Sequence, residues 1–200
     1  MNEQENMKLL VPKKTYFKKI FYFNSGQKRE FHHFKYQLLQ LKKEILKNGQ
    51  TVVFLCIGSD RATGDCFGPL IGNALSEKIK KNNRSSTVPT IYGTIEKPIH
   101  AVNLEKNILR IYDTIKNPYI IAIDASLGVM EHIGFITLGP GPLFPGIGVK
   151  KDLPKIGDAA ITGIVNVSKA ESYHTLQTTR LSTVMKLADF VSLALMETFF

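Results

Sequence analysis

Long apolar runs are missing from this chain of 200 residues. The N-terminus has no apolar stretch of about 7–15 residues leading to a small-residue cleavage site, as a secretory signal would have. The apolar segment 190–200 is far shorter than the ~20 residues that a membrane-spanning helix needs. We therefore expect a soluble protein without a transmembrane segment, located in the cytoplasm.

Cysteine is scarce, with only Cys56 and Cys66, so no disulfide framework is indicated and a reducing compartment fits better. Cys56 lies in an apolar run, which predicts a packing role. Cys66 precedes a predicted helix and is a candidate thiol nucleophile, but that chemistry needs a histidine base beside it. None of the five histidines directly follows an obvious core strand. A packing role is therefore the better interpretation of Cys66 as well.

The glycine motifs of nucleotide-binding sites are also absent. Gly58, Gly64 and Gly68 are not spaced as G-x-G-x-x-G, and no G-K-[ST] occurs. Asp60 and Asp65 would lie where phosphates bind and would repel them. The sequence therefore argues against a nucleotide site.

Acidic residues are too few to balance the basic ones, and the net charge is +9, but the excess is local. Residues 1–50 hold 11 Lys and Arg against 4 Asp and Glu, whereas residues 51–200 hold 15 against 13. We therefore expect no nucleic-acid partner for the folded body. Residues 1–27, rich in lysine and aromatic side chains, form a predicted extension that either docks on the body or a partner subunit, or presents a basic patch to an anionic membrane or DNA.

The chain is organised around residues 51–81. An apolar β-branched run over 52–57 predicts a strand buried on both faces, a polar loop covers 59–65, and a helix follows over 67–81. Strands alternating with helices predict one α/β domain over 28–200, a three-layer α/β/α fold with a mostly parallel, mixed sheet. The remaining predicted elements are helices over 28–47, 100–116 and most of 168–200, strands over 87–92, 119–123 and 161–167, an antiparallel hairpin or edge within 132–149, and a long loop over 150–160.

Two carboxylates carry the best chemical hypothesis. Asp65 follows the first strand and Asp124 ends another, so both should reach the same carboxyl edge of the sheet. Two such acids would share a proton and act as base and acid toward a water or an amide, or they would hold a divalent metal. The alternatives are a helix cap for Asp65 and an Asx turn for Asp124. Further candidates for the same crevice are Ser59, Asp60, Arg61, Thr63 and Gly64 from the loop, with Glu96, Asn166 and His174; segment 139–158 would form another wall.

Several segments together resemble the YyaC-type sporulation proteins of spore-forming Firmicutes, over about residues 50–195. They are IGSDRATGDCFGPLIG, VPTIYGTIEKPIHAVNL, IIAIDASLGVMEHIGFITLGPGPLFPGIGVKKDLPKIGD, ITGIVNVS and LQTTRLSTVMKLAD. That family is grouped with the spore germination protease and, more distantly, with hydrogenase maturation endopeptidases. The resemblance implies their three-layer, phosphorylase/hydrolase-like fold.

The resemblance also implies site residues. The aspartates of the germination protease, in D-x-x-G-P and V-D-A segments, match Asp65 and Asp124. The hydrogenase endopeptidases add a metal-binding histidine before the last helix; the best match here is Leu176, with His174 two residues earlier.

The resemblance thus implies an endopeptidase of the sporulating cell or spore, acting on a peptide or protein, with its metal use and homo-oligomerisation left open. The alternatives are a binding or regulatory protein without catalysis and, more weakly, a hydrolase of peptidyl-RNA.

Overall fold

The computed structural model describes residues 16–81, 88–143 and 155–200, and in these ranges it forms a six-stranded sheet in the order β1-β5-β6-β4-β2-β3. β2, β3, β4 and β6 are parallel to one another, whereas β5 is antiparallel to both β6 and β1. The sheet is thus mixed and mostly parallel, as predicted. The strands are β1 (Phe21–Asn24), β2 (Thr51–Cys56), β3 (Thr90–Tyr92), β4 (Pro118–Gly128), β5 (Phe135–Pro140) and β6 (Ala159–Val167).

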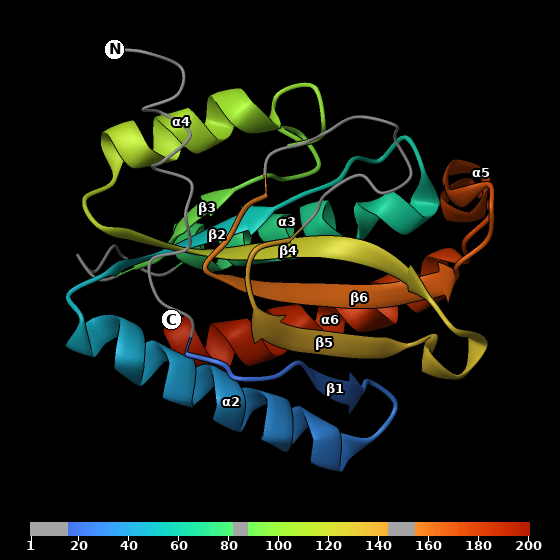
Figure 1. Ribbon diagram of the computed structural model, residues 1–200, viewed down its shortest axis with the longest axis horizontal. Coiled ribbons are helices and arrows are strands. Elements are labelled where there is room, and N and C mark those ends of the chain that lie inside the picture. The colour runs from blue at the N-terminus through green and yellow to red at the C-terminus, as the bar shows by residue number, and fades with distance from the viewer. Residues whose placement is uncertain (1–15, 82–87, 144–154) are drawn as a thin grey trace.

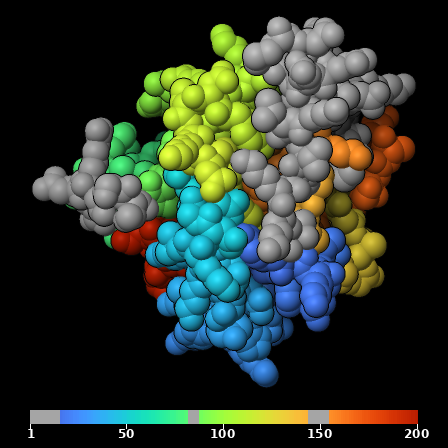
Figure 2. Space-filling view, turned by 60° about the vertical axis from the view of Figure 1, so that its left-hand side comes forward, coloured from blue at the N-terminus to red at the C-terminus, as the bar shows by residue number. Residues whose placement is uncertain are grey.

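Helices cover both faces of the sheet and complete the three predicted layers (Figure 1). α2 (Lys28–Lys47), α3 (Phe67–Lys81) and α6 (Leu181–Phe199) share one face, and α4 (Leu104–Thr114) covers the other. Figure 2 shows α2 and α4 on opposite sides of the molecule. The short elements are α5 (Ser172–Gln177) and the 3-10 turns η1 (Thr63–Cys66) and η2 (Met130–His132).

The central strands bury side chains on both faces because apolar residues occupy successive positions rather than alternate ones. In β2, Phe54 and Cys56 point into the larger core, beneath α2, α3 and α6. Val53 and Leu55 point into the smaller core beneath α4. All four side chains are fully buried. Uninterrupted apolar runs in β2 and β4 therefore account for the three-layer arrangement.

Part of the predicted extension belongs to the sheet. β1 lies within residues 1–27 and pairs with β5, from Phe21 opposite Leu138 to Asn24 opposite Phe135. Phe17 and Phe23 are buried in the larger core. Tyr16 and Phe21 pack against the same core, whereas Tyr22 is exposed, so most of the aromatic side chains of this segment belong to the domain. Residues 1–15 lie outside the described residues.

Two predicted boundaries and one predicted packing face need correction. β4 does not end on Asp124 but continues to Gly128, because β6 runs beside it and pairs with these residues. The helix predicted from residue 100 begins at Leu104. On α6, the spacing of apolar residues predicts a packing face that includes Leu181 and Met185, but both are exposed. The buried face of that helix follows Val184, Ala188, Val191 and Leu195.

Other predicted elements are confirmed. α2 and α3 have the predicted bounds, and β5 is the antiparallel strand predicted within 132–149, although β1 rather than β5 lies at the edge of the sheet. The predicted return of that hairpin and the first part of the loop at 150–160 fall within 144–154, outside the described residues. None of the described helices combines the length and apolar character needed to cross a bilayer.

Gly68 lets the first turn of α3 lie against the ends of β2 and β4. A Cβ atom there would be 2.1 Å from the carbonyl oxygen of Ile57 and 3.0 Å from that of Ile123. We predict that Gly68→Ala lowers the free energy of unfolding by about 3 kcal/mol, because the backbone of two strands would have to move. Urea unfolding measures the change. Asn73→Ala, at an exposed position of the same helix, is the control and should stay within about 0.5 kcal/mol of wild type; an equal effect in both variants would contradict the packing argument.

Candidate functional site

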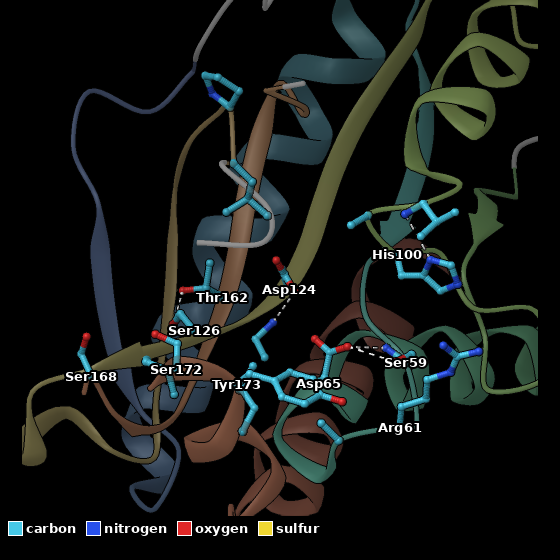
Figure 3. Close-up of a pocket in the computed structure, with 18 residues that line it drawn as sticks. Ser59, Arg61, Asp65, His100, Asp124, Ser126, Thr162, Ser168, Ser172 and Tyr173 are labelled. Carbon is cyan, nitrogen blue, oxygen red and sulfur yellow. Dashed lines mark hydrogen bonds between the residues drawn. The ribbon is translucent and has the colours of Figure 1, made fainter. Parts of the chain in front are cut away.

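A pocket of about 620 Å³ lies at the carboxyl ends of the parallel strands, where α/β sheets bind ligands. Its walls come from the loop after β2, the segment before α4, the last part of β4, and α5. Asp65 and Asp124 both line it. In Figure 3 the two acids lie at its centre, with Ser126 and Thr162 on one side and Arg61 and His100 on the other.

Asp65 is positioned by the turn that leaves β2. Gly58 has φ +129°, a conformation that L side chains rarely adopt, and a Cβ atom there would be 2.1 Å from the carbonyl oxygen of Asp65. The turn lets Ser59 donate from its backbone N–H to Asp65 Oδ2 at 2.7 Å and from its hydroxyl to the same oxygen at 3.3 Å. Ser59 therefore fixes one carboxylate oxygen, and Oδ1 accepts no hydrogen bond from the described residues.

Asp124 is held by β4 itself. Its Oδ1 accepts a hydrogen bond from the backbone N–H of Ala125 at 2.8 Å. Beyond it along the strand, the Ser126 hydroxyl lies 3.3 Å from that of Thr162, which shares a hydrogen bond of 2.6 Å with Thr137. A row of hydroxyl groups thus continues from the acid pair across β6 to β5.

Both carboxyl groups have a raised pKa. Burial raises the pKa of Asp65, while the hydrogen bonds from Ser59 and the charge of His100 act to lower it. The pKa of Asp124 lies well above its usual value, because of burial first and the nearby Asp65 carboxylate second. Burial and the charge of Asp65 therefore both favour the protonated form of Asp124.

The structure brings some of the predicted site residues to the pocket and leaves others outside. Asp65, Asp124, Ser59 and Arg61 line it, and so do Pro142 and Leu143 from segment 139–158. The predicted residues that do not line it are Asp60, Thr63, Gly64, Glu96, Asn166 and His174.

Two of the residues outside the pocket have structural roles. Gly64 packs against α5, where a Cβ atom would be 2.8 Å from Leu176 Cδ2. Asn166 donates its side-chain amide to the Thr175 carbonyl at 3.2 Å and to Thr179 Oγ1 at 3.1 Å, and so ties β6 to α5. Both residues fix the position of α5 beside the pocket rather than contacting its interior.

The candidate metal ligands do not assemble. His174 is exposed on α5, away from the pocket lining, which instead receives Leu176. Among the described residues, no three His, Cys, Asp or Glu side chains form a group that could hold a metal ion. The set Asp65, Asp124 and His174 therefore does not fit a metal site, because the third ligand points elsewhere.

Sequence reasoning missed His100, Ser126, Thr162 and Tyr173, all of which line the pocket. The sequence offered one weak indication that His100 reaches the pocket: it follows Ile99, an apolar residue located beyond the second predicted strand. Ile99 in fact pairs with Ile57 beyond the end of β2, which brings His100 to the same edge. Its Nδ1 accepts a hydrogen bond of 3.3 Å from the N–H of Val102.

Cys66 does not join the acid pair in the pocket lining. Its Sγ lies 3.5 Å from the Ala62 carbonyl oxygen and 3.8 Å from that of Ser59. Burial, followed by the charges of Asp60 and Asp65, raises the pKa of the thiol. A thiol held protonated in this way is a poor nucleophile, which supports the predicted packing role.

A family model and one relative agree with the resemblance noted in the sequence. The family model described as "Protein of unknown function (DUF1256)" matches residues 22–194. "Uncharacterized protein YyaC" of Bacillus subtilis (strain 168) is 46% identical over 144 residues, 72% of this chain and 67% of that protein. Among solved structures, the NiFe hydrogenase maturation protease HycI from Thermococcus kodakarensis KOD1 has a TM-score of 0.48 and 14% identity, covering 75% of this chain and 92% of that one.

The raised pKa of Asp124 predicts a stabilising substitution. An acid whose pKa is higher in the folded state binds more protons when folded, so stability falls as the pH rises from the unfolded pKa through the folded one. Asn keeps the acceptor for the Ala125 N–H and cannot ionise. We predict that Asp124→Asn is more stable than wild type at pH 7, by about 1.4 kcal/mol for each unit of the shift.

Urea unfolding between pH 3 and pH 8 measures this effect, and the gain should vanish below about pH 4, where the unfolded acid is protonated too. Asp113→Asn, an exposed position on α4, is the matched control and should change stability by less than about 0.5 kcal/mol at every pH. A loss of stability in Asp124→Asn at pH 7 would show that the carboxylate is stabilised in the folded protein.

Proposed function

This chain belongs to the DUF1256 family, and from that premise we propose that it is a sporulation-associated endopeptidase in which Asp65 and Asp124 activate water for peptide-bond hydrolysis. One observation carries the proposal: two carboxyl groups from separate segments line one pocket, and the charge of one raises the pKa of the other. Acids with separated pKa values are suited to divide the roles of base and acid.

The two acids would take different roles. Asp65, with Oδ2 fixed by Ser59, is the base: its Oδ1 accepts a proton from a water whose oxygen attacks the amide carbonyl. Asp124, whose raised pKa favours the protonated form, donates its proton to the amide nitrogen as the C–N bond breaks. Asp65 is then protonated and Asp124 ionised, and one proton transfer through solvent restores the starting pair.

The walls of the pocket suit a polypeptide. Apolar side chains share the lining with polar and charged groups, which is typical of a site that binds side chains and orients a backbone. Arg61 and His100 add cationic or hydrogen-bonding capacity at one wall. The apolar part of the lining consists of Ala62, Ala101, Val102, Ala125, Leu127, Pro142, Leu143 and Leu176.

A second candidate is a binding or regulatory protein of sporulation that retains the pocket without turning substrate over. Leu176 favours it, since an apolar side chain lines the pocket where the resemblance implies a metal-binding histidine. Retention of a spore peptide by wild-type protein without cleavage over long incubation would support this candidate over the endopeptidase.

Replacement of either acid should abolish cleavage. We predict that Asp65→Asn and Asp124→Asn each reduce the rate of hydrolysis of peptides extracted from spores by at least about 100-fold, the usual range for loss of a general acid or base. Mass spectrometry of the products measures the rate, and Asp113→Asn, whose side chain lies outside the pocket, should keep it. Undiminished cleavage in both active-site variants would refute the two-aspartate mechanism.

The pH dependence of cleavage should reflect the pKa values of Asp65 and Asp124. Because catalysis needs one carboxylate and one carboxylic acid, we predict a bell-shaped profile of kcat/KM. Its basic limb should fall at a pH well above the usual pKa of an aspartic acid, since burial and the charge of Asp65 raise the pKa of Asp124. Initial rates from pH 3 to pH 9 test this. A rate that keeps rising through pH 9 would exclude a protonated Asp124 as the acid.

A further inference from the structure

The last part of β4 has one open edge. β2 ends at Cys56, paired with Ile123, and the final hydrogen bond across that boundary runs from Ile57 N–H to the Ile123 carbonyl oxygen at 2.7 Å. β4 continues for five more residues, to Gly128, and there it pairs with β6 on its other side. Within the described ranges no strand pairs with the edge of 124–128 that β2 has left.

That open edge borders the acid pair. Asp124, Ala125, Ser126 and Leu127 all line the pocket. Because the main-chain groups of alternate residues in a strand face the same side, those of Ala125 face the same edge as those of Ile123. The Ala125 N–H is occupied by Asp124 Oδ1. The N–H of Ala125, which faces the open edge, is therefore hydrogen-bonded to Asp124, the acid proposed to be catalytic.

We propose that the substrate binds as an extended strand added to this open edge of β4, with one of its carbonyl groups accepting the Ala125 N–H in place of Asp124 Oδ1. This inference rests on the proposed function and specifies its substrate as an unfolded or extended peptide segment. An extended main chain is the occupant that matches a strand edge, since it supplies donors and acceptors at the spacing of a strand. A folded surface or a small molecule lacks that repeat.

The side walls fit the same occupant. Successive side chains of a bound strand point to opposite faces of the sheet. On one face they would meet Leu176, which packs against the larger core, and on the other Leu143, which packs against the smaller core. Exchange of the Ala125 hydrogen bond would also free Asp124 Oδ1 at the moment when the peptide arrives beside it. Binding and presentation of the acid would thus be coupled.

Backbone-modified peptides test the binding mode separately from catalysis. Peptides extracted from spores are passed over immobilised full-length Asp65→Asn protein, and retained peptides are identified, synthesised and titrated. Each is then remade with a single N-methyl group at every amide in turn. We expect methylation to weaken binding by about tenfold at alternate amides and by less than about threefold at the amides between them, because only alternate N–H groups face β4.

A uniform response along the peptide, or no retained peptide at all, would overturn the strand-addition inference. The proposed function is judged independently, by cleavage of the same extract by wild-type protein: cleavage without alternation would leave the endopeptidase standing and remove only the binding mode. Alternation without cleavage would support the binding mode in a protein that does not hydrolyse its ligand.

A matched pair of variants probes the same edge from the protein side. Ala125→Pro removes an N–H that has no strand partner, whereas Ala125→Val keeps it and adds bulk. We expect about a tenfold loss of affinity for the retained peptides in Ala125→Pro and less than about threefold in Ala125→Val. Equal affinities in folded variants would contradict the inference, and circular dichroism checks that both are folded. If Ala125→Pro does not fold, the N-methyl scan decides alone.

Discussion

The proximity of two ionisable carboxyl groups in a partly dehydrated pocket is the constraint around which this structure is arranged. Water would solvate both charges easily, but the pocket cannot, so the free energy of ionising Asp124 depends on the state of Asp65. Several features keep the two groups together despite that cost. Gly58 allows the turn, Ser59 stabilises the Asp65 carboxylate, and Gly68 lets α3 approach the strands.

The paired strands β2 and β4 set the positions of both acids. Their register places Cys56, the last residue of β2, beside Ile123. Asp65 therefore lies in the turn that follows β2, while Asp124 lies within β4. One acid is therefore held by a short loop and the other by a rigid ladder. The proposed division of labour follows this difference: Asp65 is fixed by donors that stabilise its charge, and Asp124 has only the Ala125 N–H to oppose its protonation.

Much of the fold was predictable because its central strands contain uninterrupted apolar runs and its helices have clear apolar stripes. Phe34, Leu38, Leu41 and Ile45 of α2 follow spacings of three and four, and all are buried. The end of β4 was not predictable, since the small and polar residues after Ile123 do not favour a strand by themselves. These residues form a strand because they pair with β6. Pairing with a strand far away in the sequence cannot be recognised from the local residues alone.

The acid pair of the site was predictable from the sequence, but several other pocket residues were not. Asp65 and Asp124 follow buried strands, so the topology alone brings them to one edge. His100 and Tyr173 reach the pocket through an isolated bridge and through a short helix tied to β6, respectively, and neither contact has a recognisable spacing. For His174 the prediction was wrong in the other direction. Its residue type suggested a metal ligand, but on α5 His174 is exposed, whereas Leu176 of the same helix lines the pocket.

The outermost strands have a consequence for self-association. β1 and β3, which bound the described sheet, are four and three residues long. Such short edge strands offer few unpaired main-chain groups to a neighbouring molecule. Edge-to-edge pairing of sheets between copies of the protein is therefore disfavoured. The unpaired edge of β4 lies instead inside the sheet, between β2 and β6 and beside the acid pair.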